Sequence, residues 1–147
     1  MVSGETLLFM QRLWSLAHGL EVRSKRMART IGVTGPQRLV IRIVGQRSLL
    51  TARELAGTLG IHPSTLTGIL RRLEDQDLIE RRLDAADRRR SRFQLTARGR
   101  RVDRERKGTV EAAVRRALGR ADRSTIAQTA WLLELLATEL SRADDSP

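Results

Sequence analysis

Residues 51–76 read TARELAGTLGIHPSTLTGILRRLEDQ, and this stretch decides the fold. Thr51 and Glu54 have the spacing of a capping box, in which each side chain bonds the other residue's backbone N–H and so begins a helix. Gly60 is suited to end that helix, because glycine adopts the left-handed conformation readily. Pro63 fits the first turn of a second helix. The second helix carries one apolar stripe, made of Leu66, Ile69, Leu70 and Leu73.

The two predicted helices have the spacing of a helix-turn-helix motif. A small residue, Ala56, stands where the helices touch, Gly60 stands at the turn, and Leu66 stands where the second helix packs on the first. The polar face of the second helix would then meet solvent or a major groove. A plain helical hairpin with a solvated face is the alternative, since this spacing alone is a weak pattern. The predicted DNA-contacting residues on that face are Pro63, Ser64, Thr65, Thr67, Gly68, Arg71 and Arg72.

Further helices are predicted before this motif. Apolar residues recur at roughly helical spacing from about Glu5 to Thr30 and predict a long first helix. Thr34 and Gln37 form another capping box, which predicts a helix that ends near Gly45. The expected apolar stripe of the first helix consists of Leu13, Leu16, Leu20, Met27 and Ile31.

A hairpin and two helices are predicted after the motif. Residues 78–83 (LIERRL) and 92–96 (RFQLT) alternate only partly between polar and apolar side chains, and they predict two short strands. Residues 96–119 predict a long charged helix interrupted by Gly99 and Gly108. Residues 124–143 predict a closing amphipathic helix, whose apolar face includes Ile126, Leu133, Leu136 and Leu140.

The tip of the predicted hairpin is strongly basic. Residues 84–92 read DAADRRRSR, with two aspartates and four arginines. Near-contiguous arginines repel one another, so such a stretch either meets an acidic partner or is merely solvated. The charge of the whole chain favours the acidic partner.

Charge is distributed unevenly along the 147 residues, whose net charge is +11. Residues 1–107 carry 23 basic and 11 acidic side chains, whereas residues 108–147 carry 5 and 6. This distribution favours a polyanion bound at one end or face, although 26 of the 28 basic residues are arginine and codon bias could contribute. The chain has only four aromatic residues, too few for a platform on which bases stack, so duplex DNA is favoured over RNA.

Other classes of function find little support in the sequence. The chain has no cysteine and only two histidines, His18 and His62, so neither thiol chemistry nor a clustered metal site is expected. His62 is interpreted as a helix cap or a phosphate contact. No nucleophile–base–acid arrangement and no glycine-rich phosphate loop occur, so no catalytic residue, enzyme activity or cofactor is predicted. The absence of a signal peptide and of a membrane-spanning run predicts a cytoplasmic protein without a membrane partner.

The order of elements resembles the MarR-type transcriptional regulators. The resemblance rests on TGPQ at 34–37, on the block at 51–81 and on DAADRRRSRFQLTARGR at 84–100. The last stretch is similar to the family's wing pattern of Asp-x-x-Asp-Arg-Arg, an apolar strand, and Leu-Thr-x-x-Gly. The matching positions are Asp84, Asp87, Arg88, Arg89, Leu95, Thr96 and Gly99.

The resemblance implies a mainly helical (α+β) fold: a winged helix-turn-helix with a two-stranded wing hairpin, and N- and C-terminal helices that form a dimerisation region. One MarR-like domain would fill 1–147, with a DNA-binding lobe at 34–100 and dimerisation helices at 1–33 and 101–147. The near-neutral, leucine-rich residues 108–147 agree with a homodimer. Two-fold symmetry would place the recognition helices on a pseudo-palindromic double-stranded operator.

The resemblance also assigns roles within the wing. An arginine of the tip would enter or lie beside the minor groove. The candidates are Arg88, Arg89 and Arg90, because the chain has one arginine more than the pattern requires, and Arg89 is the first choice. Asp84 and Asp87 would buttress the loop.

The resemblance further implies a repressor relieved by a small anionic aromatic effector. Trp14 and His18 lie one turn apart on the first helix and could line such a pocket. The favoured alternative is that Trp14 packs in the core and His18 is satisfied locally. The competing functions are a sequence-tolerant architectural DNA-binding protein and, less well supported, a winged-helix module that binds proteins.

Overall fold

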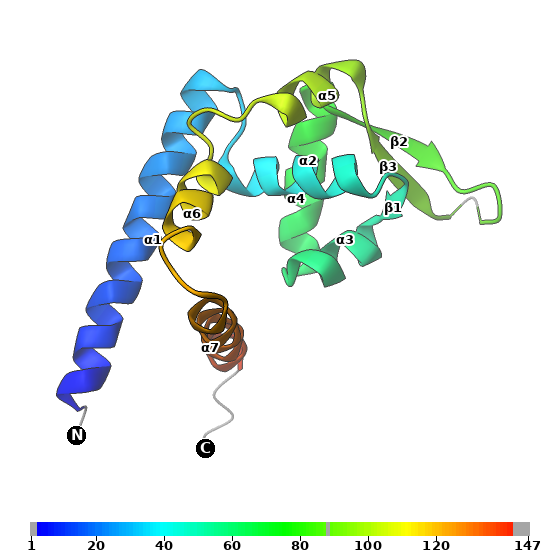
Figure 1. Cartoon of the computed structure of the whole chain (residues 1–147). Helices are drawn as coiled ribbons and strands as arrows, with labels where there is room; N and C mark the ends of the chain where they lie inside the picture. Colours follow the sequence, from blue (N-terminus) through cyan, green and yellow to red (C-terminus); the bar gives the residue numbers. More distant parts are fainter. Residues whose placement is uncertain (1–2, 88, 143–147) are drawn as a thin grey trace. The chain divides into compact units, whose positions relative to one another are not determined.

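A computed structural model gives the structure of residues 3–87 and 89–142. The chain divides into two compact units, Met1–Val110 and Glu111–Pro147. The elements run in the order α1 (Gly4–Thr30), α2 (Gly35–Gln46), β1 (Leu50–Thr51), α3 (Ala52–Leu59), α4 (Pro63–Asp75), β2 (Ile79–Leu83), β3 (Ser91–Leu95), α5 (Ala97–Arg104), α6 (Val110–Leu118) and α7 (Arg123–Ser141) (Figure 1).

The predicted helix starts are confirmed. Thr34 N donates to Gln37 Oε1 at 2.9 Å, and Gln37 N donates back to Thr34 Oγ1, which completes the capping box of α2. The equivalent bonds between Thr51 and Glu54 begin α3, at 2.8 and 3.2 Å. Gly60 ends α3 with a φ of 63°, the left-handed conformation that glycine adopts most easily. The two helices of the predicted helix-turn-helix are therefore α3 and α4.

The sheet has three antiparallel strands rather than the two predicted, in the order β1-β3-β2. β2 and β3 form the predicted hairpin, with Ile79 opposite Leu95 and Leu83 opposite Ser91. The added strand β1 pairs Leu50 with Phe93. Strand β1 was not predicted, because a two-residue strand is too short to show an alternating pattern.

The core of the first unit lies between α2, α3, α4 and the sheet. Its buried side chains come from every one of these elements, so the helix-turn-helix and the wing are built on a single core. Burying an aliphatic or aromatic side chain of this kind contributes about 1.5–3 kcal/mol. The cluster consists of Val33, Val40, Ile41, Val44, Leu50, Leu55, Ala56, Leu66, Leu70, Leu73, Leu78, Ile79, Phe93 and Leu95.

The helix predicted for residues 96–119 is two helices, α5 and α6, so the predicted interruption at Gly108 is confirmed and the one at Gly99 is wrong. Gly99 does not interrupt α5. It lies where a β-carbon would overlap the carbonyl oxygen of Leu78, so glycine is needed for close packing. The break comes at residues 105–109, where Gly108 has a φ of 73°. At this break the guanidinium of the buried Arg38 donates hydrogen bonds to the carbonyl oxygens of Val102 and Glu105. These two carbonyl groups therefore have hydrogen-bond partners although the helix does not continue.

The two longest helices expose much of their apolar surface. Of the stripe predicted for α1, only Met27 is buried, and Leu16 and Leu20 are exposed. In the second unit α7 has no buried residue among those described, and Trp131 is 64% exposed. The single chain therefore leaves apolar faces on both helices without cover.

Candidate nucleic-acid interface

Helix α4 begins at a histidine cap. His62 Nδ1 accepts a hydrogen bond from Ser64 N at 3.2 Å, and the same ring nitrogen lies 2.7 Å from Ser64 Oγ. Pro63 follows the cap, where its missing N–H leaves no intrahelical bond unmade. The hydroxyl of Thr67 donates to the carbonyl of Pro63 at 2.9 Å. These local bonds orient the hydroxyl groups at the start of the helix.

Helix α4 separates its two faces cleanly. Leu66, Leu70 and Leu73 are buried in the core, each with no more than 3% of its side chain exposed. All seven residues predicted to contact DNA on this helix are exposed on the other face. They are Pro63, Ser64, Thr65, Thr67, Gly68, Arg71 and Arg72.

The wing loop between β2 and β3 is closed by its own backbone. Asp84 N donates to Arg90 O at 2.9 Å, and Arg90 N donates to Asp87 O at 3.0 Å. Arg89 and Arg90 are exposed, and Arg88 lies outside the described residues. The loop projects beyond the sheet from the ends of β2 and β3 (Figure 1).

The two wing aspartates bond the loop from within. Asp84 Oδ1 accepts from Ala86 N and Asp87 Oδ1 accepts from Arg89 N, both at 3.0 Å. Asp87 Oδ2 also lies 3.8 Å from Arg90 Nε. The bond from Ala86 N, with help from nearby arginine side chains, lowers the pKa of Asp84 below its ordinary value. These bonds to the two carboxylates hold the loop in one shape.

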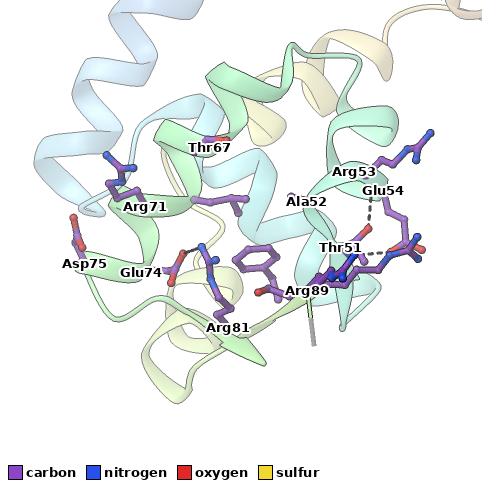
Figure 2. Close-up of a pocket in the computed structure, with 14 residues that line it drawn as sticks. Thr51, Ala52, Arg53, Glu54, Thr67, Arg71, Glu74, Asp75, Arg81 and Arg89 are labelled. Carbon is purple, nitrogen blue, oxygen red and sulfur yellow. Dashed lines mark hydrogen bonds and ion pairs between the residues drawn. The ribbon is translucent and has the colours of Figure 1, made fainter. Parts of the chain in front are cut away.

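A groove of about 820 Å³ lies between α4, the start of α3 and the wing (Figure 2). It brings together four residues that the sequence assigned to DNA contact on two separate elements, namely Thr67 and Arg71 from α4 and Arg89 and Arg90 from the wing. Phe93, Leu70 and Ser91 also line it. Helix α4 and the wing therefore share one open surface.

The groove holds more positive than negative side chains. Among the residues that the structure describes, Arg53, Arg71 and Arg89 make no ion pair, whereas Arg81 pairs with Glu74 at 3.0 Å (Figure 2). Unpaired guanidinium groups in a concave surface concentrate positive potential there and attract a polyanion.

Two further arginines line this groove and were not predicted as site residues, namely Arg53 and Arg81. Arg81 lies over the Phe93 ring, with its guanidinium carbon 5.3 Å from the centroid, and is held there by Glu74. Arg53 reaches the groove because β1 fastens the start of α3 to the wing strand β3. The capping box at Thr51 predicts that Arg53 lies in the first turn of α3. It does not predict that this turn lies beside the wing, because that depends on the pairing of β1 with β3.

The two residues suggested for an effector pocket lie elsewhere, on α1. Trp14 and His18 are both exposed in the single chain, and neither lines the groove. The favoured alternative, that Trp14 packs in the core, is wrong for this chain because the side chain is 62% exposed.

Within the part of the chain that the structure describes, no helix is long and apolar enough to cross a membrane. No three histidine, aspartate or glutamate side chains within residues 3–87 and 89–142 gather as a metal ion would require.

Comparison with known proteins adds to this geometry. An HTH-type transcriptional repressor of Mycobacterium bovis is 32% identical over 90 residues, which cover 61% of this chain and 65% of the repressor. The chain thus spans less than two thirds of the length of the curated relatives it matches.

Solved structures resemble nearly the whole chain. A MepR-like protein complexed with pseudoligands has a TM-score of 0.78 at 22% identity, over 94% of this chain and 97% of that one. Sco3205 of Streptomyces coelicolor, a MarR family regulator in complex with DNA, has a TM-score of 0.76 at 22% identity, over 100% and 98%. At these identities the likeness establishes the fold.

The three-stranded sheet, the helix-turn-helix and the loop between β2 and β3 define a winged-helix protein. Residues 33–91, which run from before α2 to the first residue of β3, match the sequence model of the MarR family. The resemblance to this family inferred from the sequence is confirmed over that segment.

Proposed function

We propose that this protein is a transcriptional regulator that binds a specific double-stranded DNA sequence as a homodimer and acts as a repressor. Each subunit would read bases in the major groove with the exposed face of α4 and reach the minor groove with the wing. Arg89 is the proposed minor-groove residue, Asp84 and Asp87 its buttress, and Arg71 the proposed base-reading arginine of α4. The curated relative from Mycobacterium bovis is named a transcriptional repressor, which supports repression rather than activation of transcription.

One observation carries this proposal: residues from α4 and from the wing line a single groove with unpaired arginines. A duplex presents a major groove and an adjacent minor groove, so a reader of both needs a helix and a projecting loop on the same side. An enzyme would instead need polar groups that converge on a reacting atom, whereas this groove is open and holds more arginines than carboxylates. The complex of Sco3205 with DNA shows this fold in use for DNA binding in that protein.

The homodimer rests on the uncovered apolar side chains of α1 and α7. Residues 1–33 and 101–147 would supply the interface, and residues 34–100 the DNA-binding lobe. Large apolar side chains exposed in contiguous groups usually mark an interface. The exposed apolar residues of α1 and α7 are Leu7, Leu8, Phe9, Met10, Trp14, Leu16, Leu20, Val22, Trp131, Leu133, Leu135 and Leu140.

Relief by a small anionic aromatic ligand is part of the proposal. The MepR-like neighbour was solved with pseudoligands, which shows that this fold accepts small molecules in that protein. Trp14 is the proposed aromatic wall and His18 the polar group one turn away. The chain has two tryptophans, so a titration with benzoate that quenches fluorescence in the native chain but not in Trp14→Phe would support this site.

The competing function is a sequence-tolerant architectural protein held to DNA by charge. It shares the groove and the arginines, so the two functions differ only in specificity. A selection of bound duplexes from a random pool at near-physiological salt separates them. The regulator predicts an enriched inverted repeat with half-sites about one helical turn apart. Recovery of duplexes with no common sequence would support the architectural protein instead.

A further inference from the structure

Arg92, a residue of β3, makes contacts with three separate parts of the winged-helix segment. Its Nε donates to Asp84 Oδ2 at 3.1 Å, and its Nη1 donates to the carbonyl oxygen of Leu49 at 2.9 Å. The same Nη1 lies 3.9 Å from Glu54 Oε2. One guanidinium therefore joins the base of the wing loop to the segment before β1 and to the first turn of α3. The rigid, planar fork of arginine makes such divergent bonds possible.

On the wing side, the contact reaches the tip through a chain of bonds. Asp84 uses one carboxylate oxygen for Arg92 and the other for Ala86 N. Asp87, which follows Ala86 in the chain, accepts a hydrogen bond from the backbone N–H of Arg89. A movement of Asp84 would therefore be passed to the part of the loop that carries Arg89.

On the side of α3, Arg92 contacts Glu54 and Leu49, and each of these residues is also held by another hydrogen bond. Glu54 Oε2 accepts from Thr51 N at 2.8 Å in the capping box of α3. Leu49 has a φ of 64°, unusual for a residue with a side chain, and its N–H bonds the carbonyl of Phe93. Arg92 is thus anchored to the helix-turn-helix at points that have little freedom to move.

The partly shielded setting of Arg92 distinguishes it from its neighbour across the strand. Arg82 on β2 stands directly opposite Arg92, but its only ion pair among the described residues is with Glu80 at 3.6 Å, with 64% and 46% of the two side chains exposed. The side chains of Arg92 and Asp84 are 34% and 14% exposed. A shielded pair with direct hydrogen-bond geometry holds its partners better than an exposed one.

We propose that Arg92 is a positioning residue, which ties the wing loop to the first turn of α3 and so fixes where Arg89 stands relative to α4. The proposal rests on the proposed function, because position matters only if helix and wing read the same duplex. Arg92 itself need not touch DNA. Its effect on binding runs through Arg89.

The position of the wing can be measured without DNA. The chain has no cysteine, so the variants Ala85→Cys and Gly57→Cys together give one spin-label pair between the wing loop and α3. Labelled protein is diluted with unlabelled protein so that only distances within one chain are read. We expect a narrow distance distribution in the otherwise native chain and a broader, shifted one with Arg92→Gln. Arg82→Gln removes the same charge and should leave the distribution unchanged.

Arg92→Lys provides the second variant, should Arg92→Gln unfold. It keeps the charge, but a single ammonium group cannot hold Asp84 and Leu49 in the same geometry. Arg92→Lys should therefore also broaden the distribution. The same distribution in the native chain, Arg92→Gln and Arg92→Lys would overturn the proposal.

Binding to the selected duplex then tests the route through Arg89. Arg89→Ala should weaken binding by about tenfold in the native chain, equivalent to about 1.4 kcal/mol, and by much less when Arg92→Gln is already present. Equal losses in the two backgrounds would mean that Arg92 does not act through the wing tip. If the native chain binds no duplex, the proposed function fails, whereas the distance measurement still decides whether Arg92 positions the wing.

Discussion

Arg89 and Arg82 differ in what surrounds them although both are exposed arginines near the wing. Arg89 lines the groove and makes no ion pair among the described residues, whereas Arg82 pairs with Glu80 and does not line it. Arg89→Ala should therefore lose about 1–3 kcal/mol of binding free energy, mainly on duplexes with A·T-rich flanks. Fluorescence anisotropy with A·T-rich and G·C-rich flanks measures this, and Arg82→Ala is the control of equal charge. A uniform loss for both variants would show that only net charge matters.

Arg71 belongs to the same groove but should act differently. It projects from α4, where an arginine can make two hydrogen bonds to a guanine edge. Arg71→Ala should relax the preference at one base pair of each half-site, by about 1–3 kcal/mol. Repeating the duplex selection with this variant shows the change directly. An unchanged consensus would assign Arg71 to the phosphate backbone.

The carboxylates of Asp84 and Glu54 predict how stability depends on pH. Backbone N–H groups, of Ala86 and Thr51 respectively, hold both pKa values below their ordinary values of 3.8 and 4.5. Because the folded chain binds protons less readily than the unfolded chain, this stabilisation is complete above those ordinary values and is lost as pH falls through the lower folded ones. Thermal unfolding between pH 6 and pH 3 should show the decline, and Asp84→Asn should make it shallower. An identical decline in both proteins would show that Asp84 contributes nothing.

At the scale of the elements, Gly99 and Gly57 predict opposite effects of substitution by alanine, because Gly99 is closely packed and Gly57 is not. A β-carbon at Gly99 would overlap the Leu78 carbonyl oxygen, so Gly99→Ala should force α5 away from the sheet and destabilise the fold by about 1–3 kcal/mol. Gly57 on α3 has no atom within 4 Å of such a β-carbon. Gly57→Ala should therefore stabilise the helix, by about 0.5–1 kcal/mol. Urea unfolding of both variants tests the contrast, which equal effects would contradict.

The start and end of most elements follow from local chemistry and could be predicted. The capping boxes at Thr34 and Thr51 and the left-handed Gly60 act over a few residues, so the sequence alone reveals them. The break between α5 and α6 could be predicted only in part, from Gly108. It also depends on Arg38, which reaches carbonyl groups more than sixty residues away in the sequence. Strand β1 was missed for a similar reason, since only its partner β3 makes it a strand.

The parts of the candidate site that depend on local sequence could also be predicted, whereas their arrangement in space could not. The exposed face of α4 and the basic wing tip could be predicted, because one follows from helical periodicity and the other from a local run of arginines. These two surfaces share a groove with Arg53 and Arg81 because β1 packs against α3 and β2 packs against α4. Such packing involves residues distant in the sequence, and no local pattern records it.

At the scale of the whole molecule, the exposed apolar residues of α1 and α7 predict a homodimer. Trp131 is 64% exposed in the single chain, so Trp131→Glu should leave each chain folded while it opposes association. Gln128→Glu places the same charge on an exposed polar position of α7 and serves as control. Sedimentation should show a dimer for the native chain and for the control, and a monomer for Trp131→Glu. A native chain that sediments as a monomer at micromolar concentration would contradict the interface.

The central claim is that α4 and the wing together read a DNA sequence. The most direct test is the ratio of the dissociation constants for a scrambled duplex and for the selected operator, measured at near-physiological salt with the native chain. A regulator predicts a ratio of about 10³ or more, which Arg89→Ala and Arg71→Ala should each reduce. A ratio near one, with a steep dependence on salt for both duplexes, would contradict the claim and leave a protein that coats DNA by charge alone.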